Sequence, residues 1–363
     1  MKNKSIIVVL FLIIVIFIGV FLLNRPKPKK QLKDNIIKKE EVKEEKKELT
    51  IDDYKNNNVN ELGEVPIMMY HGIHNKKNSE TEYTGGNVDR DGYQRTSEAF
   101  RADLEFYYQN NYRMIRLTDY VDGNIDVELG KSPIILTFDD GLENNIKVTG
   151  LDKDGNIIID PNSAVGILEE FKTKYKDYNV TATFFVNDEL FNQDEYNEKI
   201  LKWLVDNGYD IGNHTNSHVN FSKCDTLKSE EEVGSIYSKL DSIIKDKYVN
   251  IVALPFGSPY SLDHENMSHI FTSTYNGKTY ETKSALRVGW KAELSPFDLD
   301  FNPKFLKRIR AYDNNGVEFD IEMNFNLLES VRYISDGDKN KVVIPEYKKE
   351  SLNNDIKKEI IKY

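Results

Sequence analysis

Short runs of apolar and β-branched residues recur between residues 65 and 312, and each has the length of a buried strand. In one of them, ILTF at 135–138 leads directly into two adjacent carboxylates, Asp139 and Asp140. Runs of this length and composition are typical of strands that are covered on both faces. The seven runs are VPIMMYH (65–71), PIILTFDD (133–140), VTATFFV (180–186), YDIGNH (209–214), IVALPFG (251–257), ALRVGW (285–290) and LKRIRAY (306–312).

Amphipathic stretches of helical length separate most of these runs. They cover residues 97–111, 162–175, 195–208 and 229–246. Ser97 is the expected N-cap of the first. Strands that alternate with helices predict an α/β protein with a parallel sheet, and seven strands favour closure into a barrel. Residues 148–161 interrupt this alternation, and we interpret them as an inserted hairpin that turns at 153–156.

The N-terminus has the character of a membrane anchor. Residues 5–23 contain no charge over 19 positions and are nearly all apolar, which is long enough to span a bilayer as a helix. No small-residue cleavage site follows, so we expect an uncleaved transmembrane helix within residues 1–24. Residues 25–62 are predicted to form a charged flexible linker, residues 63–345 the folded domain, and residues 346–363 a C-terminal tail.

The charge balance argues against nucleic acid as a partner. The first 50 residues carry a net charge of +6 and the whole chain −11, which leaves −17 for residues 51–363. A nucleic-acid-binding domain would show the opposite balance. The single cysteine, Cys224, excludes an internal disulfide.

Chemistry-bearing residues gather at the carboxyl ends of the predicted strands, where parallel α/β folds place their sites. The first strand ends at His71, the second at Asp139 and Asp140, and the fourth runs into His214 and His218. Two histidines four positions apart can lie on one side of a turn, and an aspartate would complete a two-histidine, one-carboxylate metal set. A cation would also offset the repulsion between the aspartates, and the second aspartate could accept a proton from water. The alternative is a polar loop beside a turn, without metal.

The motifs resemble those of the polysaccharide deacetylases of carbohydrate esterase family 4, the NodB-homology domain. TFDDG (137–141) and HTNSH (214–218) are similar to the first two motifs of that family, and PFG (255–257) to the core of the third. The resemblance implies a distorted (β/α) barrel that hydrolyses N-acetyl or O-acetyl groups of polysaccharides. It further implies that Asp139 is the general base and that Asp140, His214 and His218 hold a divalent metal. Zinc is the favoured ion, with cobalt, nickel and iron as alternatives.

The third motif and two rim residues complete the expected site. The resemblance implies that the Phe256 N–H stabilises an oxyanion and that Pro255 lies at the substrate. Trp290, at the end of its run, is a candidate for stacking on a sugar ring, with simple packing as the alternative.

The chain departs from the family pattern in two places. Ala253 stands where the third motif usually has an arginine that orients the base, and no histidine follows His269 to serve as the usual acid. VPIMMYHGI resembles the first strand of the deacetylases that act on poly-N-acetylglucosamine, which makes His71 the candidate acid. Arg308 is the candidate to hold Asp139. We expect Arg308 and Arg310 to face opposite sides of their strand, so that only one points inward.

We therefore expect a membrane-anchored, metal-dependent hydrolase that deacetylates an extracellular or cell-wall polysaccharide. Its catalytic domain would lie outside the cell, because polymeric substrates are found there, although the lysines that follow the anchor argue for the cytoplasm. The first alternative is an inactive polysaccharide-binding protein that keeps the barrel, which the two departures motivate. The second is a non-haem iron oxygenase, since those enzymes also use two histidines and a carboxylate.

Overall fold

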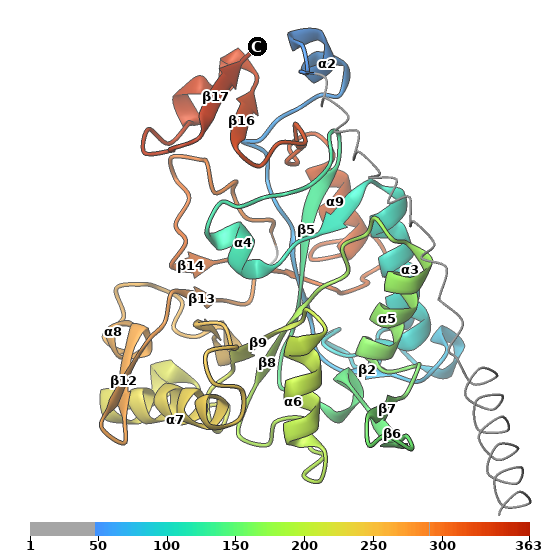
Figure 1. The fold of residues 1–363 in the computed structure, drawn as a ribbon, viewed down its shortest axis with the longest axis vertical. Helices are drawn as coiled ribbons and strands as arrows, with labels where there is room; N and C mark the ends of the chain where they lie inside the picture. The colour runs from blue at the N-terminus through green and yellow to red at the C-terminus, as the bar shows by residue number, and fades with distance from the viewer. Residues whose placement is uncertain (1–47, 290) are drawn as a thin grey trace, which may run out of the picture. The chain divides into compact units, whose positions relative to one another are not determined.

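A computed structural model of the chain describes residues 48–289 and 291–363. Residues 49–363 form one compact unit, shown as a ribbon in Figure 1. The expected transmembrane helix and most of the expected linker lie outside the described residues. Within the described part, none of the helices has both the length and the apolar character needed to cross a membrane.

The centre of the unit is a nine-stranded sheet in which every pairing is parallel. Its main path runs in the order β14-β13-β10-β9-β8-β5-β1-β15, and β4 pairs with β5 off this path. The strands are β1 (Ile67–Tyr70), β4 (Tyr112–Met114), β5 (Ser132–Phe138), β8 (Thr183–Val186), β9 (Asp210–Asn213), β10 (Ile251–Ala253), β13 (Ser284–Leu286), β14 (Phe305–Leu306) and β15 (Ile309–Arg310). This curled parallel sheet confirms the predicted α/β class and the distorted barrel.

One short segment closes the sheet on itself. β14 pairs with β13 and β15 pairs with β1, although only Lys307 and Arg308 separate β14 from β15 in the chain. The expected single strand 306–312 is therefore two short strands that join opposite ends of the sheet. Gly289 allows this closure, since a Cβ there would lie 2.7 Å from the carbonyl oxygen of Arg308.

The four predicted helices are present, and Figure 1 shows them around the sheet. They are α3 (Ser97–Gln109), α5 (Ala164–Lys174), α6 (Asn197–Asp206) and α7 (Thr226–Ile244). The prediction that Ser97 caps α3 is wrong, because the Thr96 hydroxyl accepts the Ala99 N–H at 3.0 Å and Thr96 has the extended backbone of an N-cap. The predicted hairpin is also present and pairs β6 (Val148–Leu151) with β7 (Ile157–Ile159).

The remaining elements are short and lie around this framework. They are α2 (Ile51–Asn56), β2 (Ile73–His74), β3 (Arg95–Thr96), α4 (Leu117–Val121), α8 (Asn266–Phe271), β11 (Thr272–Tyr275), β12 (Lys278–Glu281), α9 (Ile321–Leu328), β16 (Lys341–Ile344) and β17 (Glu359–Lys362). The largest group of buried apolar side chains joins β1, β5, β8 and β9 to α3, α5, α6 and α7. This packing fixes the strand ends on which the site is built.

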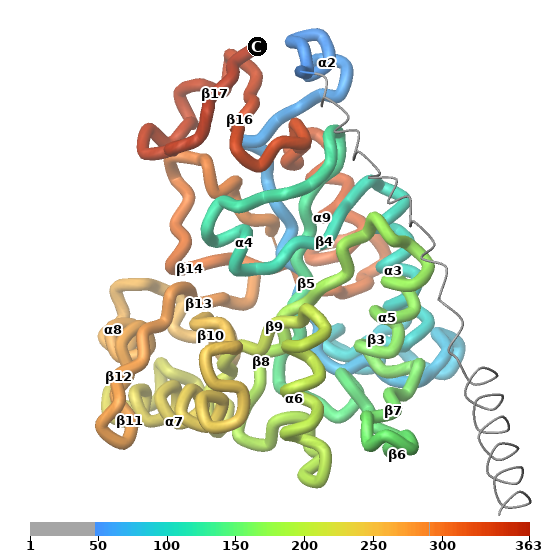
Figure 2. The backbone as a smooth tube through the Cα atoms, in the orientation of Figure 1, coloured from blue at the N-terminus to red at the C-terminus, as the bar shows by residue number. Residues whose placement is uncertain are grey.

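The ordered unit extends beyond both expected boundaries of the domain. Residues assigned to the linker form α2, and residues assigned to the tail form β17, which pairs with β16. Figure 2 shows these two ends of the described chain next to each other. Tyr54 and Val59 pack against Val343 in a small apolar cluster. Both stretches were expected to be unstructured because they are highly charged, and the few apolar residues that anchor them gave no clear pattern.

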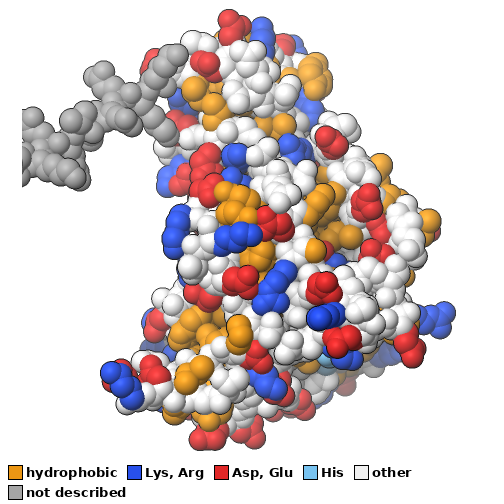
Figure 3. All heavy atoms as spheres, turned by 90° about the vertical axis from the view of Figure 1, so that its right-hand side faces the viewer, with side chains coloured by type: hydrophobic (Ala, Val, Ile, Leu, Met, Phe, Trp, Pro, Cys, Tyr) orange, Lys and Arg blue, Asp and Glu red, His pale blue; other side chains and the backbone are white. Residues whose placement is uncertain are grey.

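The surface carries both signs of charge. Figure 3 shows one face of the protein, on which acidic and basic side chains are interspersed without a continuous basic area.

Glu61, near the start of the described unit, forms hydrogen bonds with residues in its C-terminal part. Its side chain is buried, with 2% of the residue exposed, and it accepts hydrogen bonds from the Tyr333 hydroxyl (2.8 Å) and from the Val343 N–H (2.7 Å). Burial, followed by the nearby charge of Asp336, raises the pKa of Glu61 to about 8, although its hydrogen bonds act in the opposite direction. A carboxyl group in this position holds its proton in the folded state well above the usual pH.

We predict that Glu61 makes the stability of the protein pH-dependent. Its pKa is higher in the folded state (about 8) than the ordinary value of 4.5, so the stability it adds is fully present below pH 4.5 and is lost as pH rises through 8. Urea unfolding should show the free energy of unfolding falling by a few kcal/mol between pH 5 and pH 9. The decrease in the free energy of unfolding over this pH range should be clearly smaller in Glu61→Gln, because the amide does not titrate. Replacing the exposed Glu350 by Gln is the control and should leave the fall unchanged, whereas equal pH profiles for wild type and Glu61→Gln would contradict the assignment.

Candidate active site

The end of β5 separates its two aspartates into different environments. The Asp139 N–H donates to the Tyr70 carbonyl at 3.0 Å and so continues the ladder toward β1. Asp140 then takes a left-handed backbone with φ of +73°, followed by Gly141 at +58°. A Cβ at Gly141 would lie 2.3 Å from the Leu190 carbonyl oxygen, so only glycine fits this turn. The two carboxylates can therefore bind different partners despite being adjacent in sequence.

Asp139 forms a buried ion pair with Arg308. The guanidinium donates from Nη1 to Oδ1 and from Nη2 to Oδ2, both at 2.7 Å, and Arg308 is 0% exposed. Arg308 also donates to the Thr137 hydroxyl (3.2 Å) and to the Arg287 carbonyl (3.2 Å). The structure thus places Arg308 on the aspartate that the sequence analysis assigned to it, although Ala253 occupies the usual position of the arginine.

This pairing keeps Asp139 ionised. Burial by itself would raise the pKa of Asp139, but the Arg308 charge, with smaller contributions from His214 and His71, holds the pKa well below its usual range. The side chain is nevertheless 2% exposed and lines the pocket. The site therefore contains a carboxylate whose ionised form is favoured by its ion pair with Arg308.

Asp140 faces the two histidines of the HTNSH loop. Its Oδ1 lies 3.1 Å from Nε2 of His214 and 3.4 Å from Nε2 of His218. Potential ligand atoms of these three residues all lie within 4.8 Å of one another. Burial would raise the pKa of Asp140, but its contact with His214 and the charges of both His214 and His71 lower it. Three ligand atoms thus converge on one small region.

The tautomer of His214 suits metal binding. Its Nδ1 lies 2.8 Å from the Ala253 carbonyl, which can only accept a hydrogen bond, so Nδ1 carries the proton and Nε2 presents its lone pair. Within the described residues Nε2 is buried without a hydrogen-bond partner, although Asp140 Oδ1 is only 3.1 Å away. Both atoms belong to the group of ligand atoms that lie within 4.8 Å of one another. Together with His218 they fit a divalent metal.

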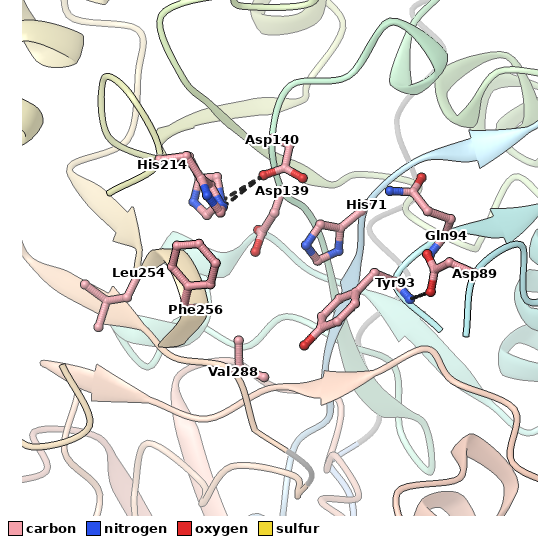
Figure 4. A pocket seen from close by; sticks show the side chains of 11 residues that line it. His71, Asp89, Tyr93, Gln94, Asp139, Asp140, His214, Leu254, Phe256 and Val288 are labelled. Carbon is pink, nitrogen blue, oxygen red and sulfur yellow. Dashed lines mark hydrogen bonds and ion pairs between the residues drawn. The ribbon is translucent and has the colours of Figure 1, made fainter. Parts of the chain in front are cut away.

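These residues line one pocket with a volume of about 350 Å³. Figure 4 shows the side chains of His214, Asp139, Asp140 and His71 converging, with Phe256 on one side. The eleven residues that line the pocket are His71, Asp89, Tyr93, Gln94, Asp139, Asp140, His214, His218, Leu254, Phe256 and Val288. Of the other expected residues, Arg308 lies behind Asp139, and Pro255 is buried and absent from the lining. Trp290 lies outside the described residues.

His71 enters the pocket from the end of β1. The Asn145 side-chain amide donates to the His71 carbonyl at 2.7 Å, which fixes the backbone at this point. The ring lies edge to face with Tyr93, with 5.0 Å between ring centroids, and its buried Nδ1 has no hydrogen-bond partner in the described structure. Burial lowers the pKa of His71, while the charges of Asp139 and Asp140 oppose this effect. The ring itself lines the pocket.

The backbone around the pocket is unusual at several non-glycine residues. Asp140, Thr215, His218 and Phe256 all have positive φ angles, between +53° and +73°. Residues in this region are strained, and strain of this kind gathers at functional sites. At Phe256 it turns the chain after β10, so that the side chain is 55% exposed and its ring lies 4.8 Å from the His218 ring.

The expectation that Arg308 and Arg310 face opposite sides is wrong. Side chains two positions apart in a strand share a face, because the period of a strand is two. Arg308 lies at the floor of the site, and Arg310 lines a neighbouring pocket with Val288. Arg308 thus contacts Asp139 in the site, and Arg310 lies beside the site rather than on the opposite side of the sheet.

Sequence reasoning missed five of the lining residues. Asp89, Tyr93 and Gln94 belong to the long loop after β1, which shows no periodic pattern, and Leu254 and Val288 follow β10 and β13. The only available signal was position, since all five follow the carboxyl ends of central strands.

Comparison with solved structures supports the fold. The deacetylase PplD of Streptococcus pyogenes, solved in complex with acetate, has a TM-score of 0.51 and 17% identity, over 75% of this chain and 99% of that chain. A de-N-acetylase from Aggregatibacter actinomycetemcomitans has a TM-score of 0.43 and 11% identity, over 67% of this chain and 93% of that chain. The second likeness is too weak to argue from, and the first shows the fold. No curated protein matches the sequence.

The family comparison concerns the segment that carries the motifs. The sequence profile described as Polysaccharide deacetylase matches residues 126–269. This range includes TFDDG, HTNSH and PFG, whereas His71 and Arg308 lie outside it. Residues 126–269 are therefore similar to polysaccharide deacetylases, and the motifs within this range converge on one pocket.

Proposed function

We propose that the protein is a metal-dependent hydrolase that removes N-acetyl, or O-acetyl, groups from an extracellular or cell-wall polysaccharide. The observation that supports this most strongly is the division of roles at the end of β5. Asp140 converges with His214 and His218, while Asp139 is held separately by Arg308 in the same pocket. A metal set beside a second carboxylate that does not bind the metal can activate water for the hydrolysis of an amide.

Asp140, His214 and His218 would hold the metal, with zinc favoured for two nitrogens and one oxygen. The bound ion would polarise the acetyl carbonyl and increase the acidity of an attacking water. The Ala253 carbonyl orients His214 through Nδ1, which leaves Nε2 as the ligand atom. The chain thus supplies three ligands and leaves room in the pocket for substrate.

Asp139 would accept the proton of the attacking water. Its lowered pKa keeps it ionised, and the two hydrogen bonds from Arg308 fix both oxygens in position. A carboxylate with a low pKa is a weak base, so its effect depends on a water that is already acidified. Arg308 is therefore a positioning residue that sets the geometry and the charge of the base.

His71 and the third motif would act at the other end of the scissile bond. The His71 ring lines the pocket beside Asp139, where it could donate a proton to the leaving nitrogen. The N–H of Phe256, at the turn after β10, would donate to the developing oxyanion. Pro255 would shape this turn, because its ring restricts the backbone just before Phe256.

We infer the class of substrate and the location from the similarity to polysaccharide deacetylases. Polysaccharide deacetylation implies an acetylated glycan as the partner, and such polymers lie outside the membrane. We therefore place the domain on the outer side of the cell membrane, held by the apolar segment 5–23. Trp290 remains our candidate for stacking on a sugar ring.

Removal of a metal ligand is the first test. In the purified protein, His214→Ala and His218→Ala should each lose most of the bound metal and most acetate-releasing activity, because two ligands cannot hold the ion tightly. Metal content is measured by plasma mass spectrometry. The control is His269→Ala, since His269 pairs with Glu230 and does not line the pocket. Stoichiometric tight metal in both ligand variants would overturn the assignment.

The role of Asp139 can be separated from that of Asp140. Asp139→Asn keeps the shape of the side chain and removes its charge, so we expect acetate release to fall by roughly 10²–10⁴-fold while the metal stays bound. Asp140→Asn is the matched comparison and should lose metal. If Asp139→Asn also loses its metal, the two aspartates share the ligand role.

The role of His71 is tested by comparing two leaving groups. An amide nitrogen must be protonated to leave, whereas an aryl oxide leaves without help. His71→Ala should therefore reduce N-deacetylation by about 10²–10⁴-fold and reduce hydrolysis of an activated aryl acetate much less. The metal content should be unchanged. Equal losses on both substrates would show that His71 has a structural role.

A further inference from the structure

A second, smaller pocket adjoins the first. This neighbour has a volume of about 120 Å³ and is lined by Val288, Gly289, Arg310 and Phe319. Val288 lines both pockets, so the two adjoin at this residue. Arg310 lies in β15, two positions after Arg308, which contacts Asp139.

The Arg310 guanidinium contacts two aromatic rings. Its Cζ lies 5.0 Å from the centroid of the Tyr93 ring and 4.6 Å from that of Tyr312. Its backbone is fixed as well, since Arg310 lies opposite Met69 in the pairing of β15 with β1. A guanidinium that packs on aromatic faces keeps its edge free to donate hydrogen bonds. Arg310 is therefore ordered without its donors being consumed by the stacking.

The loop after β1 supports the same arrangement. Asp89 accepts hydrogen bonds from the N–H groups of Tyr93 (3.0 Å) and Gln94 (2.8 Å), which fixes Tyr93 in the pocket wall. Gly92, with φ of +65°, packs so closely on Tyr312 that an added Cβ would lie 1.8 Å from its ring. Tyr93 and Tyr312 are thus both positioned by contacts that do not involve Arg310.

The charge of Arg310 has no partner in the described part of the protein. Arg308 is paired with Asp139 and Arg95 with Asp103, but Arg310 forms neither an ion pair nor a hydrogen bond through its side chain to a described residue. Residues 51–363 carry a net charge of −17, so carboxylates are abundant in this domain. An ordered and uncompensated arginine beside the site is therefore suited to an anion brought by the substrate.

We propose that Arg310, stacked between Tyr93 and Tyr312, forms a subsite for an acidic sugar residue next to the acetylated one. This inference rests on the proposed polysaccharide substrate and names its class as an anionic glycan. A sugar carboxylate matches the free edge of the guanidinium, which can donate two parallel hydrogen bonds. The acidic surface of the domain would repel an anionic polymer elsewhere and so favour binding at this one position.

Binding to the metal-free protein tests the subsite apart from catalysis. The probes are a hyaluronan tetrasaccharide, in which N-acetylglucosamine alternates with glucuronic acid, its neutral methyl ester, and neutral chitotetraose. By calorimetry on the full chain in EDTA, the tetrasaccharide should bind at least about tenfold more tightly than its methyl ester. The preference should shrink as salt rises from 50 to 500 mM.

Substitution of Arg310 then tests whether this residue causes the preference for the acid over the methyl ester. Arg310→Gln should abolish the difference between acid and ester, and Arg310→Lys should keep part of it. The matched control is Arg332→Gln, because Arg332 also stacks on a tyrosine, Tyr112 at 5.4 Å, but lines neither pocket. Equal binding of acid and ester by wild type, or a preference that survives Arg310→Gln, would overturn the proposal. Acetate release from chitotetraose by the metal-loaded enzyme is measured separately, so failure of the proposed activity is distinguishable.

Discussion

The site depends on the buried ion pair between Arg308 and Asp139. Arg308 stands at the only point where the chain passes from β14 to β15, and these strands join the two ends of the sheet. The same short segment therefore closes the barrel and positions the Arg308 guanidinium. Removing one partner of such a buried pair typically costs about 3–5 kcal/mol, because the other charge remains buried and uncompensated. The strand end that carries the aspartates is thus fixed by the fold as a whole.

This pair also explains how two adjacent carboxylates can be tolerated at a strand end. The negative charge of Asp139 is balanced by Arg308. The Asp140 side chain instead lies next to His214 and His218. The left-handed backbone at Asp140 and the glycine at 141 make this divergence possible. A parallel barrel with this division differs from the β-sandwich expected of a non-haem iron oxygenase. It also weakens the case for an inactive binding protein, because Arg308 replaces the arginine whose absence suggested that alternative.

Much of the fold could be predicted from the sequence, because buried strands and amphipathic helices leave strong periodic patterns. The meeting of Asp140, His214, His218 and His71 in one pocket could be predicted for a related reason, since parallel strands gather their carboxyl ends at one rim. The split of residues 306–312 into β14 and β15 could not be predicted, because a break of two residues leaves the apolar pattern unchanged.

Elements and site residues that rely on a few long-range contacts also escaped prediction. α2 and β17 lie in strongly charged stretches, where a few apolar residues such as Tyr54 provide the anchoring contacts. Tyr93 reaches the pocket only because Asp89 and Gly92 shape an irregular loop. Such contacts depend on the completed fold and leave no local pattern.

The most direct test of the account is acetate release before and after metal removal. The protein would be treated with chelator, reconstituted with zinc, and incubated with peptidoglycan, poly-N-acetylglucosamine, chitin oligosaccharides and acetylated xylan. The account predicts acetate from at least one of these glycans, loss of that release on chelation, and recovery with zinc. Tightly bound stoichiometric metal without acetate release from any glycan, or release that is insensitive to chelation, would contradict it.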